Sequence, residues 1–113
     1  GFMWRLVDVV KALELRPIHP GEPFAIAFHV IDPVLGNQQI SIEFAEQKMY
    51  YMQQPAATRI TLSVEHLTQL FCGMRSASEL QWLGAIEVEG DSTLVAKLDA
   101  AWQATPPFCW DFF

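Results

Sequence analysis

Two neighbouring segments with alternating apolar positions constrain the fold of this chain most strongly. From Phe24 to Val30, every second residue is apolar and bulky, and successive residues of a strand point to opposite sides of a sheet. Residues 39–45 alternate in the same way, and the turn residues of Asp32-Pro33 and Gly36-Asn37 stand between the two segments. The pattern predicts a pair of strands with a buried face, and therefore a sheet that needs a covering layer.

The remaining periodicity predicts the other elements. Strands are expected over residues 48–53, 59–64 and 86–89, and helices over residues 4–15, 67–73, 76–84 and 91–103. Ser76 and Glu79 have the spacing of a capping box, and Asp91 is expected to cap the last helix. We therefore expect one α+β domain over residues 1–113, a two-layer sandwich in which helices cover a mainly antiparallel five-stranded sheet.

Composition excludes several classes of function. Of the 113 residues, 51% are apolar and 18% are charged, which gives the chain enough apolar area to form a core. The formal net charge of −6 argues against nucleic acid as a partner, because phosphate contacts need clustered Lys and Arg. No apolar run approaches the length of about 20 residues that spans a bilayer. The acidity itself has two interpretations, solubility or attraction of a cationic partner.

The cysteines indicate a cellular compartment, and the first residues indicate whether the chain is part of a longer protein. Cys72 and Cys109 stand far apart with no CxxC motif, which favours reduced thiols and a cytoplasmic protein over a disulfide framework. The chain begins Gly1-Phe2-Met3, so we expect a piece of a longer protein or a residue left by tag removal.

Motifs of the common catalytic and metal sites are absent from the sequence. No P-loop, GxGxxG, HExxH or GxSxG occurs, and the histidines do not have the spacing of metal ligands. Glu87 and Glu89 fall on the same side of a short predicted strand, where we interpret them as solubilising charges. The residues alone therefore predict neither a metal site nor a bound cofactor in this chain.

The last six residues carry an unusual concentration of aromatic side chains. Four of the six are aromatic, whereas chain termini are usually polar. One interpretation is a tail that folds back over the core, chiefly through Phe108 and Trp110. A second is that packing fixes the α-carboxylate of Phe113 among aromatic rings, where desolvation raises its pKa and lets it act as a base.

Four stretches of the sequence form a recognisable set: residues 3–13, the strand that ends in Asp32-Pro33, residues 67–80, and the tail with Asp111-Phe112. Together they resemble the C-terminal domain of Eis-type (enhanced intracellular survival) GNAT N-acetyltransferases, which has a sterol-carrier-protein-like fold. The resemblance covers essentially the whole chain. It implies that the parent protein transfers an acetyl group from acetyl-CoA to an amine, and that this chain alone is inactive.

The resemblance also implies the roles of individual residues. In that family the terminal carboxylate acts as general base in the active site of a preceding acetyltransferase domain, and that position is Phe113 here. Trp110, Asp111 and Phe112 would then contact the substrate. The implied partners are the upstream domain, an amine substrate and further copies of the chain in a homo-oligomer. Acetyl-CoA would bind to the parent protein, and no cofactor to this chain.

Two alternatives of other classes remain open. The first is a free-standing sterol or lipid carrier with an apolar tunnel, for which the candidate lining residues are Phe24, Phe28, Met49, Met52 and Phe71. Methionine and aromatic residues at such positions more often belong to an ordinary hydrophobic core than to a ligand tunnel. The second is an interaction domain that only builds an oligomer.

Overall fold

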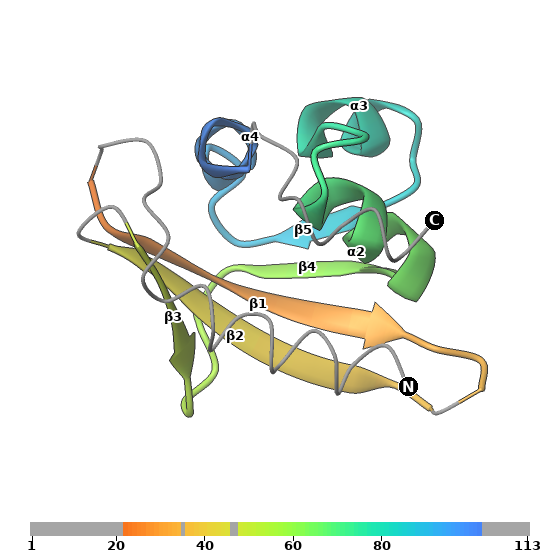
Figure 1. The fold of residues 1–113 in the computed structure, drawn as a ribbon, viewed down its shortest axis with the longest axis horizontal. Coiled ribbons are helices and arrows are strands. Elements are labelled where there is room, and N and C mark those ends of the chain that lie inside the picture. The colour runs from red at the N-terminus through yellow and green to blue at the C-terminus, as the bar shows by residue number, and fades with distance from the viewer. Residues whose placement is uncertain (1–21, 35, 46–47, 103–113) are drawn as a thin grey trace.

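The computed structural model describes residues 22–34, 36–45 and 48–102. In these residues three helices lie on the same face of a twisted sheet (Figure 1). The elements are β1 (Phe24–Ile31), β2 (Gln38–Ala45), β3 (Lys48–Met52), β4 (Arg59–Ser63), α2 (Val64–Phe71), α3 (Ala77–Trp82), β5 (Glu87–Glu89) and α4 (Leu94–Ala101). The expected strands and the last three expected helices are therefore present, while the helix expected over residues 4–15 lies outside the described residues.

The five strands form one mixed sheet in the order β3-β2-β1-β4-β5. β1 pairs with β2, β2 with β3, and β4 with β5 in antiparallel fashion. β4, however, runs parallel to β1, with Phe28 opposite Ile60. The α+β class with a five-stranded sheet is thus confirmed, but the sheet is mixed. Alternation along a strand fixes which face is buried, whereas the direction of the neighbouring strand depends on how the chain returns to the sheet edge.

The core lies between the sheet and the helices. Phe28, Ile42 and Ile60 come from the three central strands, and their side chains have no exposed surface. Leu67 of α2 and Leu98 of α4 cover them from the helical layer. The other face of the sheet is more polar, and the burial of β4 alternates residue by residue as expected. A one-residue shift of any of these strands would move its apolar side chains into water, so the burial pattern fixes the register.

Short helices are held by specific caps at both ends. Ser63 and Ser76 accept hydrogen bonds from the backbone N–H groups three residues later, at 3.0 Å in each case. The expected cap at Ser76 is therefore confirmed, although the Glu79 carboxylate pairs with Arg75 instead of returning to the cap residue. At the other end of α2, Gly73 has a φ of 71° and donates to Leu70, a conformation that glycine adopts at little cost.

The last helix begins later than expected. α4 starts at Leu94, and Asp91 forms a turn in front of it, in which Oδ1 accepts from Thr93 N at 2.9 Å and from Thr93 Oγ1 at 2.5 Å. These hydrogen bonds to the charged form hold the pKa of Asp91 below its usual value of 3.8. The expectation that Asp91 caps a helix starting there is wrong, because its side chain closes a local turn in competition with the helix.

Candidate functional site

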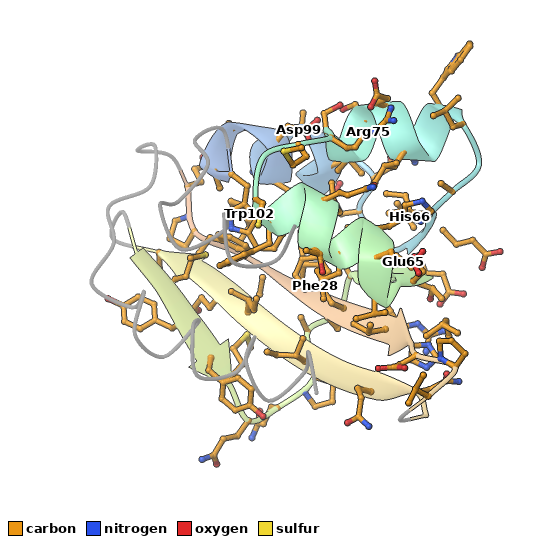
Figure 2. The ribbon with its side chains drawn as sticks, turned by 45° about the vertical axis from the view of Figure 1, so that its right-hand side comes forward. Phe28, Glu65, His66, Arg75, Asp99 and Trp102 are labelled. Atoms are coloured by element: carbon orange, nitrogen blue, oxygen red, sulfur yellow. The ribbon has the colours of Figure 1, made fainter. Side chains whose placement is uncertain are left out.

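An aromatic cluster fills the space where the helices meet the sheet. Trp102 at the end of α4 projects toward the sheet near Phe28, and the two rings stack with centroids 5.4 Å apart (Figure 2). Phe44 and Phe71 meet the same indole edge-on, at 5.7 Å and 5.4 Å. Its Nε1–H donates to the sulfur of Met49 at 3.0 Å. Trp102 is only 6% exposed, so β1, β2, β3 and α2 pack together with α4 around one side chain.

A cavity of about 220 Å³ opens beside this cluster, between α4 and the segment that joins α2 to α3. Leu70, Leu98 and Trp102 form its apolar wall, and Arg75, Ser76 and Asp99 contribute polar groups. Figure 2 shows Arg75 and Asp99 close together where α3 begins. Pockets that enclose a small organic ligand typically measure about 300–1,000 Å³. The cavity is therefore smaller than a lipid requires.

Asp99 ties α4 to the first turn of α3. Its Oδ1 accepts from Ala77 N at 2.5 Å, and its Oδ2 accepts from Ser78 N at 3.2 Å and from Ser78 Oγ at 2.6 Å. Three bonds from backbone and hydroxyl donors satisfy most of the acceptor capacity of this carboxylate. Asp99 thus serves as a tertiary helix cap. The sequence does not indicate this role, because no local motif marks a cap supplied from 22 residues away.

The four predicted site residues cannot be placed. All of them lie outside the described residues, so the roles of Trp110, Asp111, Phe112 and Phe113 stay predictions.

The candidate lipid-lining residues separate into two groups. Phe28, Met49 and Phe71 are buried in the core, and Phe24 stacks on Phe44 at 4.6 Å. Met52 pairs with Ser41 and falls on the opposite face of the sheet, because it lies three residues from Met49 along β3.

Cys72, the residue after α2, corrects one expectation. It is fully buried, and the structure records it as disulfide-bonded. The expectation of reduced thiols is therefore wrong for Cys72, and the cysteines no longer support a cytoplasmic location. Cys109 lies outside the described residues.

Within residues 22–34, 36–45 and 48–102, no cluster of three potential metal ligands occurs. No helix in the same part of the chain is long and apolar enough to cross a membrane.

Solved structures with the same fold fall into two kinds. A probable N-acyltransferase of unknown function from Enterococcus faecalis V583 is 26% identical with a TM-score of 0.62, over 88% of this chain and 25% of that chain. A GCN5-related N-acetyltransferase from Kribbella flavida is 18% identical with a TM-score of 0.63, over 89% and 27%. A palmitated sterol carrier protein 2-like 2 from Aedes aegypti is 15% identical with a TM-score of 0.59, over 92% and 94%.

The chain therefore spans about a quarter of the two transferases but nearly all of the free-standing carrier. No curated protein matches the sequence significantly. The family model for the sterol carrier protein domain matches residues 9–110. The mixed five-stranded sheet covered on one face by helices agrees with that match. The chain belongs to the sterol carrier protein domain family.

Proposed function

We propose that this chain is the C-terminal domain of a GNAT-type N-acetyltransferase, in which it completes the active site and contributes to assembly. The observation that favours this proposal over a lipid carrier is the filled interior. Trp102 occupies the space between α4 and the sheet, and the rings of Phe28, Phe44 and Phe71 surround it. An acyl chain lying between these layers would have to displace the indole of Trp102, which is only 6% exposed.

The comparison with transferases supports the same proposal. The probable N-acyltransferase from Enterococcus faecalis is the most identical of the three solved structures described above, at 26%. In that protein the matching domain is a quarter of a longer chain, which leaves room for a catalytic domain elsewhere. Under this proposal the acetyl-CoA site and the proton donor belong to the preceding domain.

The chemistry assigned to this chain is a single proton transfer. As the amine nitrogen attacks the thioester carbonyl of acetyl-CoA, a carboxylate accepts the proton that the nitrogen loses, and the CoA sulfur leaves with a proton from an acid of the other domain. In a protein that ends at Phe113, the carboxylate is the α-carboxylate of that residue. Trp110, Asp111 and Phe112 would position the amine, and the net charge of −6 favours a cationic amine substrate.

The test uses the full natural polypeptide that contains this chain. Adding one alanine after Phe113 moves the carboxylate by one residue, and turnover of acetyl-CoA with an amine is expected to fall by about 10²-fold or more. Phe113→Leu keeps the carboxylate in place and serves as the matched control, because only the ring changes. Unchanged turnover after the extension would refute the role of the terminal carboxylate. Absence of any acetyl transfer would refute the proposed function itself.

A free-standing lipid carrier is the second candidate. Its support is the likeness to the palmitated carrier from Aedes aegypti, of which this chain spans 94%. Native mass spectrometry of the purified protein should then show a co-purified lipid, and a fluorescent fatty acid should be displaced by palmitate. Neither result is expected under the transferase proposal. We further propose a homo-oligomer, which size-exclusion chromatography with light scattering would test.

A further inference from the structure

The C-terminal end of α3 presents a tryptophan to solvent. Trp82 is 85% exposed, and Leu83, which follows it, is 57% exposed. In Figure 1, α3 lies on the outer side of the helical layer, away from the sheet. Burial of a tryptophan side chain contributes strongly to binding energy. Tryptophan is also enriched among the residues that dominate protein interfaces. Among the described residues this pair is therefore the clearest unused apolar surface.

The pair is held on a rigid support. At the start of α3, the cap by Ser76 and the three hydrogen bonds to Asp99 fix the first turn. At its end, Ala85 N donates to Leu80 O at 2.8 Å and Gly84 N donates to Gln81 O at 3.0 Å, which is the hydrogen-bond pattern of a Schellman motif. Gly84 has the positive φ of 75° that this motif requires. The backbone that carries Trp82 is consequently fixed before any partner binds, which lowers the entropy lost on docking.

The size of the surface indicates what kind of partner it fits. A tryptophan buries about 150–250 Å², so the 85% exposed ring of Trp82 offers about 200 Å². A stable complex of two free proteins buries about 800 Å² on each side. Leu83 adds less than Trp82, because it is smaller and less exposed. The patch is therefore too small for a strong dimer of free chains. A polypeptide link between two domains supplies an effective concentration in about the millimolar range, at which a small patch is sufficient for docking.

The charged residues of the segment that contains Trp82 indicate which charge the partner surface should carry. Residues 76–96 contain four carboxylates and no lysine or arginine, the carboxylates being Glu79, Glu87, Glu89 and Asp91. Arg75 and Arg59, from outside this segment, pair with two of the four. Lys97, which follows this segment, acts on Asp91, so these four carboxylates and three basic residues leave one net negative charge. A neutral or basic rim suits that charge better than an acidic one.

We propose that Trp82 and Leu83 anchor this domain to another domain of the same polypeptide, in an apolar recess with a neutral or basic rim. The proposal rests on the proposed function, which supplies the second domain. It assigns to α3 an interdomain contact that is separate from the tail and from the cavity beside Trp102. The contact holds the two domains in one orientation, as a site built from both domains requires.

The first test is hydroxyl-radical footprinting of the full natural polypeptide, read by mass spectrometry. The oxidation rate of Trp82 is compared with its rate in the unfolded protein, and Met74, which is 59% exposed, is the internal control. Docking desolvates the indole, so Trp82 is expected to be protected about tenfold or more, and Met74 only a few-fold. Oxidation of Trp82 at close to its unfolded rate would overturn the proposal.

The second test compares two exposed apolar residues by mutation. Trp82→Ala is expected to raise the rate of proteolysis between the domains by about tenfold, since an anchor residue is lost. Val34→Ala is the matched control, because Val34 is also 85% exposed but lies in the turn after β1. Equal cleavage rates in the two variants would contradict the proposal.

These outcomes separate the two proposals. If the polypeptide transfers acetyl groups but Trp82 stays exposed, the contact is wrong and the proposed function stands. If the polypeptide has no second domain, the proposed function fails and the contact fails with it. Protection of Trp82 that grows with protein concentration would show self-association, and would overturn docking within one polypeptide.

Discussion

Replacement of Trp102 by alanine tests the filled interior directly. A tryptophan buries about 150–250 Å², which at about 25 cal/mol per Å² corresponds to about 4–6 kcal/mol, part of which alanine retains. Trp102 is 6% exposed and contacts three aromatic rings and the Met49 sulfur. We therefore expect Trp102→Ala to lower the free energy of unfolding by about 4 kcal/mol, within the usual range for large aromatic truncations.

The chain offers a matched control for this substitution. Trp82→Ala removes the same atoms from a side chain that is 85% exposed, and in the separate 113-residue chain it is expected to change the free energy of unfolding by about 0.5 kcal/mol or less. Trp102→Phe is a milder variant that keeps an aromatic ring but loses the hydrogen bond to Met49 and part of the buried area. Its expected cost is about 1–2 kcal/mol.

The assay is urea unfolding followed by circular dichroism. A loss of 4 kcal/mol corresponds to a fall of about 2 M in the urea midpoint for a chain of this size. If Trp102→Ala does not fold, Trp102→Phe still gives a measurable midpoint. Similar costs for Trp102→Ala and Trp82→Ala, or a cost below about 1 kcal/mol for the former, would refute the reasoning that Trp102 fills the space between α4 and the sheet.

Three further predictions concern turns and caps. Asp99→Ala should destabilise by about 1–2 kcal/mol, measured by urea unfolding, because α3 loses three hydrogen bonds. Gly90→Ala should destabilise more than Gly36→Ala in thermal melts. Both glycines have positive φ, but a Cβ at Gly90 would lie 2.8 Å from Thr58 Oγ1, whereas nothing lies within 4 Å at Gly36. The lowered pKa of Asp91 means that its stabilising effect is present above pH 3.8 and is lost as the pH falls further. The difference between the wild type and Asp91→Asn should therefore shrink in unfolding titrations below that pH, and a constant difference would contradict it.

Local sequence signals predicted the elements well, and failed where a partner comes from far along the chain. The cap at Ser76 was predictable because its acceptor and donor are three residues apart. The second support of the same helix turn comes from Asp99, which no local pattern connects to it. α4 starts later than the sequence predicts, since the Asp91 side chain favours a turn with Thr93 over a helix.

The candidate site divides in the same way. The sequence indicated that Phe28, Met49 and Phe71 are apolar positions of strands and a helix, which is equally consistent with a core or with a ligand tunnel. In the described region all three side chains are buried and contact Trp102, which enters from the end of α4. The aromatic tail remains a prediction from sequence.

By itself, the sequence determined the α+β class, the buried faces of β1, β2 and β4 and the cap at Ser76, because these depend on neighbours within a few residues. Only the tertiary structure decided that β4 runs parallel to β1, that one indole fills the space over the sheet, and that Trp82 faces solvent. These features depend on contacts between residues far apart in the chain, and periodicity along one segment carries no information about which distant segment packs against it.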